Sequence, residues 1–100
     1  MTDELRFEWD LKKAWVNDRK HGVSFTLAKQ FLESDAASLE IFDEAHSADE
    51  DRFITIGPID GGVILVVWTE PEEGVVRIIS ARWATKGEEQ IYRTWRQPDE

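Results

Sequence analysis

The sequence predicts an α+β domain, in which helices pack on an antiparallel sheet. Three observations support that prediction. Apolar residues recur at helical spacing twice in the first third of the chain and once near its end. Between these segments lie four short runs rich in Val, Ile and aromatic residues, which are typical of strands. Glycine-containing turns separate the last three runs, and such turns favour hairpins and therefore antiparallel neighbours.

The first third of the chain predicts a short strand and two helices. Residues 5–9 alternate apolar and charged side chains, as a strand does. Asp10 is a suitable N-cap for a first helix, and Gly22 suits the left-handed position just after its end. Ser24 is placed to cap a second helix. The expected apolar stripes are Leu11, Ala14 and Trp15 on the first helix and Phe25, Ala28, Phe31 and Leu32 on the second.

Four consecutive strands and a last helix complete the prediction. The strands are expected over residues 39–42, 52–57, 63–69 and 75–81, as an antiparallel meander. The run 63–68 is apolar on both faces, so we expect it at the centre of the sheet. Thr85 and Glu88 have the spacing of a capping box and begin the last helix. One face of this helix carries Glu88, Ile91, Tyr92 and Trp95.

Composition bounds the class of protein. One hundred residues with 41% hydrophobic content are enough for one core, so we expect residues 1–100 to form a single domain. The chain has no cysteine, which excludes disulfides, thiolate zinc sites and a cysteine nucleophile. No apolar run is long enough for a secretory signal or a membrane span. A cytoplasmic protein without membrane contact is therefore expected.

The negative charge is concentrated in the middle of the chain. The formal net charge is -9, yet residues 36–76 alone hold ten acidic side chains and one basic side chain. The flanking segments are nearly balanced, with seven acids and six bases before and four acids and five bases after. Charges on solvated loops are largely screened beyond about 10 Å. The acidity therefore argues against nucleic-acid binding only weakly.

The reactive side chains suit metal-free cleavage of RNA. The two histidines lack metal-ligand spacing, and no glycine-rich phosphate loop is present, so we expect no metal and no cofactor. Attack by the 2′-hydroxyl of RNA on the adjacent phosphate needs a base, an acid and cations. The chain offers these groups in two sets. The candidate catalytic residues are His21, Arg77, Arg82, Glu88 and Tyr92, and the candidate RNA-binding residues are Lys20, Arg52 and Lys86.

Four of these candidates also have a structural explanation. Lys20 and His21 lie in the last turn of the first helix, where the helix dipole favours a cation. Glu88 is already accounted for by the capping box. Tyr92 shares the apolar face of the last helix and suits a core position with its hydroxyl at the rim.

The arginines leave two geometries open. Arg52 follows an acidic run and suits an ion pair at the edge of a strand. Arg77 and Arg82 are five residues apart, so an unbroken strand directs them to opposite faces. In that case one serves the site and the other the scaffold. Otherwise the strand ends or bulges before Arg82.

Two segments together resemble the BrnT family of toxins. They are Lys20-His21-Gly22-Val23-Ser24-Phe25 and Arg77-Ile78-Ile79-Ser80-Ala81-Arg82. Further positions agree in order from residue 7 to residue 92: Phe7-Glu8-Trp9-Asp10, Asn17, Arg52, Ile56-Gly57, Thr69, Ala84, Glu88 and Tyr92. The resemblance covers nearly the whole chain.

The resemblance implies a RelE-like fold and a ribonuclease toxin of a bacterial type II toxin-antitoxin pair. The family is described as cutting RNA without a metal. Its partner would be a BrnA-type antitoxin, which inhibits the toxin and supplies the only contact with operon DNA. Carried over by position, the implied site residues are Lys20, His21, Arg52, Arg77, Arg82, Glu88 and Tyr92.

The chain departs from the family around the start of the last helix. Family members carry several basic residues there, whereas this chain has Trp83, Gly87, Glu89 and Gln90. Fewer cations weaken the attraction for phosphates. The alternative function is therefore a catalytically degenerate BrnT-like module that only binds its antitoxin or another protein partner.

Overall fold

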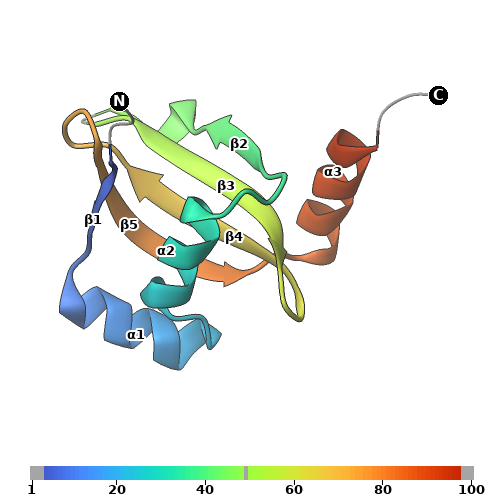
Figure 1. Cartoon of the computed structure of the whole chain (residues 1–100), viewed down its shortest axis with the longest axis horizontal. Coiled ribbons are helices and arrows are strands. Elements are labelled where there is room, and N and C mark those ends of the chain that lie inside the picture. Colours follow the sequence, from blue (N-terminus) through green and yellow to red (C-terminus); the bar gives the residue numbers. More distant parts are fainter. Residues whose placement is uncertain (1–3, 49, 98–100) are drawn as a thin grey trace.

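The computed structural model describes residues 4–48 and 50–97. Its elements are β1 (Arg6–Glu8), α1 (Leu11–His21), α2 (Phe25–Glu33), β2 (Leu39–Phe42), the 3-10 turn η1 (Glu44–His46), β3 (Arg52–Ile59), β4 (Gly62–Thr69), β5 (Val75–Trp83) and α3 (Lys86–Arg96). Figure 1 shows α2 lying across the sheet, α1 beside β5, and α3 at one end. The α+β class predicted from the sequence is observed. Within the described ranges, no helix has the length and apolar character needed to cross a membrane.

The sheet has five strands in the order β1-β5-β4-β3-β2. Strands β2 to β5 pair antiparallel with their neighbours in the chain, and β4 lies at the centre, as predicted. The pairing of the first strand was not predicted. Strand β1 pairs in parallel with β5, with Phe7 opposite Val76. The alternation that predicts a strand carries no information about a partner so distant in sequence. The sheet is therefore mixed, rather than a meander with a separate strand.

Strand β3 is two residues longer than predicted because it continues through Pro58. The pairing of β3 with β2 stops at Ile56, so Pro58 lies beyond the end of that neighbour. A proline is tolerated at such an edge position. Just before it, Gly57 allows a close approach, since a Cβ there would lie 2.6 Å from the ring of Phe31 on α2. Glycine therefore lets α2 pack tightly on β3.

Helix α2 buries its apolar face as predicted, but α1 does not. The main core cluster contains Val23, Phe25, Ala28, Phe31, Ile64, Val66, Ile78 and Ala81. On α1, Leu11 is 80% exposed and Trp15 is 62% exposed. Of the stripe predicted for α1, only Ala14 packs against the core, and Trp15 instead lies under the Arg19 guanidinium at 5.1 Å. The prediction was wrong because α1 runs along the margin of the sheet rather than across it.

Asn17 fixes α1 to β5. Its Nδ2 atom donates to the carbonyl oxygens of Val23 at 2.9 Å and Ala81 at 2.8 Å, and its Oδ1 atom accepts from the Ala81 N–H at 3.1 Å. Strand β1 pairs only with the start of β5, so Ala81 has no strand neighbour on that side. The buried Asn17 amide takes the place of the missing strand.

Strand β5 bulges in its middle. Ile79 is passed over in the pairing with β4, so it is an extra residue on this strand. Ile78 and Ala81 both face α2, although an unbroken strand would point them to opposite faces. The bulge was one of the two geometries that the sequence left open. It places three side chains on the opposite face of the sheet, called the open face below: Arg77, Ser80 and Arg82.

Helix α3 buries only one of the apolar side chains on its predicted face. Tyr92 is buried in a second cluster with Ile56, Val63 and Leu65. Ile91 is 56% exposed and Trp95 is 48% exposed, so the prediction of a buried apolar face holds only at Tyr92. Figure 1 explains the difference, since α3 stands at the end of the sheet instead of lying on it.

Candidate functional site

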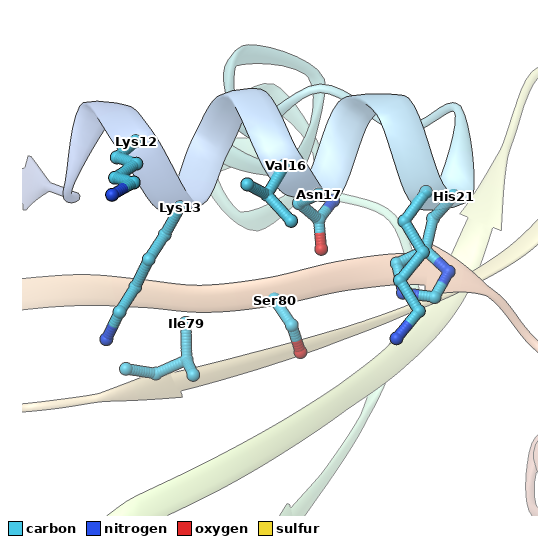
Figure 2. Close-up of a pocket in the computed structure, with 8 residues that line it drawn as sticks. Lys12, Lys13, Val16, Asn17, His21, Ile79 and Ser80 are labelled. Atoms are coloured by element: carbon cyan, nitrogen blue, oxygen red, sulfur yellow. The ribbon is translucent and has the colours of Figure 1, made fainter.

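A groove lies between α1 and the outer edge of β5. Its volume is about 380 Å³, and it is lined by Lys12, Lys13, Val16, Asn17, Lys20, His21, Ile79 and Ser80. Figure 2 shows Lys13, Val16 and Asn17 pointing from α1 toward the strand that carries Ile79 and Ser80. Lys20 and His21 therefore lie beside β5. Because Ser80 also belongs to the open face, the groove borders that face.

The local sequence explains why the groove is where it is. Asp10 begins α1 by accepting a hydrogen bond from the Lys13 N–H at 3.0 Å, and this bond lowers the pKa of the Asp10 carboxyl. Gly22 ends α1 in the left-handed conformation, and its N–H donates to the Asp18 carbonyl. Both caps were predicted from the sequence. They place Lys20 and His21 in the last turn of α1, one turn beyond Asn17.

Arg82 and Glu88 form a two-point ion pair between β5 and α3. The two guanidinium nitrogens of Arg82 donate to the two carboxylate oxygens of Glu88 at 2.7 and 2.8 Å. Glu88 also accepts from the Thr85 N–H at 2.9 Å, which completes the capping box. Chiefly because of the Arg82 hydrogen bonds, the pKa of Glu88 falls to about 2, and the pKa of Arg82 rises. Glu88 is therefore a carboxylate at neutral pH.

Arg77 lies on the open face at the other end of β5. Its Nε atom donates to a carboxylate oxygen of Glu8 at 2.7 Å, across the β1–β5 pairing. Both side chains of this pair are nearly half exposed. An exposed ion pair contributes little to stability, so a phosphate group could replace Glu8 at small cost.

Arg52 lies apart from the groove. It begins β3 and lines a different hollow with His46, Ala48 and Glu50. Its backbone N–H donates to the Ser47 hydroxyl at 2.9 Å, and its Nε atom is buried without a hydrogen-bond partner among the described residues. The register nevertheless aligns Arg52 with Thr69 and Thr69 with Arg77, so one row of the sheet carries both arginines.

The last two candidates differ in exposure. Tyr92 is buried, and its hydroxyl donates to the Ala37 carbonyl at 2.6 Å. This geometry matches the core role that the sequence left open for Tyr92. Lys86 is the first residue of α3, and it is exposed.

The candidate residues thus form groups along β5 rather than one closed pocket. His21 and Lys20 flank the groove, Arg77 and Arg82 lie on the open face, and Ser80 lies where the groove and that face meet. Within residues 4–48 and 50–97, no three or more His, Cys, Asp or Glu side chains are grouped so that they could hold a metal ion. The arrangement offers cations, one imidazole and a hydroxyl next to an open strand face.

Sequence reasoning missed several residues that line the groove. Lys12 and Lys13 precede His21 by two turns, and Ile79 and Ser80 face them from the bulge. The helical spacing 12, 16, 20 and 13, 17, 21 would have placed the α1 residues on one face. Nothing in the sequence indicates which strand edge lies opposite them.

Comparisons with known proteins find a matching family and a similar solved structure. The model of a protein family described as "Ribonuclease toxin, BrnT, of type II toxin-antitoxin system" matches residues 9–88, a range that ends before Tyr92. The structure is similar to the crystal structure of the Brucella abortus ribonuclease toxin BrnT, with a TM-score of 0.59 and 27% sequence identity. That similarity covers 82% of this chain and 99% of the other. A comparison with curated proteins gives no match.

Proposed function

Because the chain belongs to the BrnT family of ribonuclease toxins of type II toxin-antitoxin systems, we propose that it is an endoribonuclease that needs no metal. In this proposal residues 1–100 act as a single cytoplasmic domain with a RelE-like fold. A BrnA-type antitoxin binds and inhibits the toxin, and operon DNA is contacted only through that antitoxin.

One observation carries the site assignment. The Asn17 amide joins α1 to Ala81, the residue between Ser80 and Arg82. It therefore holds the last turn of α1, which bears His21, against the part of β5 that presents a hydroxyl and a guanidinium. An RNA phosphate lying on this edge would meet groups from both elements.

His21 is assigned the proton transfer from the 2′-hydroxyl. Imidazole is the side chain that exchanges protons near neutral pH. Glu88 is too weak a base, because Arg82 lowers its pKa to about 2. Tyr92 is buried and bonded to the Ala37 carbonyl. His21 therefore remains as the proton acceptor among the candidates.

The cationic candidates are assigned contacts with the phosphate groups of the RNA. As the 2′-oxygen attacks, its bond to phosphorus forms, the bond to the 5′-oxygen breaks, and solvent returns a proton to that leaving oxygen. Charge accumulates on the remaining phosphate oxygens, where preorganised cations stabilise it. Arg82 is held in place by Glu88, which acts as a positioning residue. Arg77, Lys20, Arg52 and Lys86 are assigned binding of the phosphate backbone.

The test is cleavage of RNA by the purified chain in the presence of EDTA. We expect activity to persist, and Arg82→Ala and Arg77→Ala to reduce it separately, with the larger loss for Arg82→Ala. Circular dichroism would verify that both variants stay folded. Activity that needs a divalent cation, or that both variants retain in full, would contradict the proposal.

A second candidate function is a partner-binding module without catalysis. The observation in its favour is that both motif arginines already face carboxylates, Arg77 with Glu8 and Arg82 with Glu88. Expression of the chain alone in a bacterial host separates the two functions. A nuclease arrests growth, and the arrest is relieved by the antitoxin, whereas a binding module leaves growth unchanged.

A further inference from the structure

The groove beside β5 is a basic site in an acidic chain. Four of its eight lining residues are lysine or histidine, and none of the eight is acidic. The whole chain has 21 acidic and 12 basic residues, so this composition is a local exception. The mechanism uses Lys20 and His21 at one end of the groove. It leaves Lys12 and Lys13, at the other end, without a role.

The lysines of the groove are available for a ligand. Among the described residues, none of Lys12, Lys13 and Lys20 lies within ion-pair distance of a carboxylate. Arg77 and Arg82 differ, since each is already paired. All three lysines are exposed on α1. An anion in the groove would therefore gain their charge without breaking an existing pair.

The spacing of the lysines along α1 limits which ligands fit the groove. Lys12 and Lys20 are separated by two helical turns, which is about 12 Å along the axis of α1. Between them the groove is apolar, with Val16 on α1 and Ile79 on β5. A ligand that fits has negative charge at both ends and an apolar, flat group in the middle. A short stretch of single-stranded RNA, in which phosphates alternate with bases, has this pattern.

We propose that the groove binds a single-stranded segment of the RNA substrate. Lys12 and Lys13 hold one phosphate, Lys20 holds a phosphate further along the same strand, and a base between them rests on Val16 and Ile79. A paired base in a duplex is stacked inside the helix, so it cannot enter the groove. Lys12 and Lys13 are binding residues only, because they lie two turns away from His21. This inference rests on the proposed function, since it names the substrate form that the same site takes.

The test uses an RNA that cannot be cleaved. A single-stranded oligoribonucleotide with 2′-O-methyl groups on every sugar lacks the attacking hydroxyl, and its binding is followed by fluorescence anisotropy over a range of salt concentrations. The variant is Lys12→Ala/Lys13→Ala. The matched control is Arg93→Ala/Arg96→Ala, which removes the same charge from α3, outside the groove. Lys12→Arg/Lys13→Arg retains the charge and should retain the binding.

We expect the lysine double variant to bind at least about tenfold more weakly at low salt. The slope of log affinity against log salt should fall by about 0.7 for each phosphate that the variant no longer neutralises. The control should be weakened much less. A duplex of the same sequence should bind wild-type protein more weakly than the single strand. Equal weakening of both double variants would mean a general charge effect and would overturn the proposal, as would equal binding of duplex and single strand.

Failure of this inference and failure of the proposed function give different results. If natural RNA is cleaved and the lysine double variant binds and cleaves as wild type does, the groove assignment is wrong while the nuclease stands. If the lysine double variant alone binds weakly but natural RNA is never cleaved, the groove assignment stands while the nuclease is wrong.

Discussion

Helices α1 and α3 are attached to the sheet in different ways. On one side, α1 is joined to β5 by the buried amide of Asn17, which bonds both backbone groups of Ala81. On the other side, α3 is held by Tyr92 in the second core cluster and by the partly exposed Arg82–Glu88 pair. Buried, fully satisfied hydrogen bonds resist loss far more than exposed ion pairs do. The His21 side of the site is therefore fixed by the core, whereas the Arg82 side depends on an interaction at the surface.

The largest effect is expected on the α1 side, from Asn17→Leu. This change removes three hydrogen bonds and leaves the Ala81 N–H and two carbonyl groups buried without partners, so unfolding should become easier by about 3 kcal/mol or more. Denaturant unfolding followed by tryptophan fluorescence measures it. Asp18→Asn, at the exposed neighbouring position, is the control and should change little. If Asn17→Leu destabilised the chain less than Tyr92→Phe does, the claim that α1 is attached more firmly than α3 would be wrong.

A smaller effect is expected on the α3 side, from Tyr92→Phe. The ring stays in the core, and only the hydrogen bond to the Ala37 carbonyl is removed, which should cost about 1 kcal/mol. The same denaturant measurement tests this value. Ile91→Ala is a control from the same helix, because its side chain is largely exposed. Unchanged stability of Tyr92→Phe would mean that the hydroxyl does not help to hold α3.

The smallest effect is expected from the pH dependence of the Arg82–Glu88 pair. The pKa of Glu88 in the folded chain is lowered from 4.5 to about 2, so the pair contributes stability above pH 4.5 and loses it as the pH falls toward 2. Because the pair is partly exposed, the contribution is modest. Glu88→Gln should therefore show a shallower loss of stability between pH 5 and 2 than wild type. Parallel curves for the two proteins would show that the pair does not hold α3.

The sequence predicted features that depend on neighbouring residues. The caps at Asp10, Ser24 and Thr85 were confirmed, since each cap involves a side chain and a backbone group three positions apart. The strands were also located, from the spacing of apolar residues and from the turns between them. Several observed strand ends differ from the predicted ends by one or two residues. Local chemistry of this kind needs no knowledge of the rest of the fold.

Features that join distant parts of the chain could not be predicted. Asn17 and Ala81 are 64 positions apart, so the sequence pattern of α1 favoured an apolar stripe over the amide that is in fact buried. The partner of β1 and the bulge at Ile79 depend in the same way on pairing between strands. Arg82 and Glu88 were both proposed as site residues, yet only the structure shows that they pair with each other.

The central claim is that His21, on the α1 side of β5, accepts the proton and that Tyr92 is structural. Single-turnover cleavage of one RNA, with EDTA present and at a temperature where both variants are folded, compares His21→Ala with Tyr92→Phe. We predict that His21→Ala slows cleavage by at least about 100-fold, the usual contribution of a proton-transfer residue, while Tyr92→Phe cleaves at the wild-type rate. Slow cleavage by Tyr92→Phe together with near-normal cleavage by His21→Ala would contradict the account.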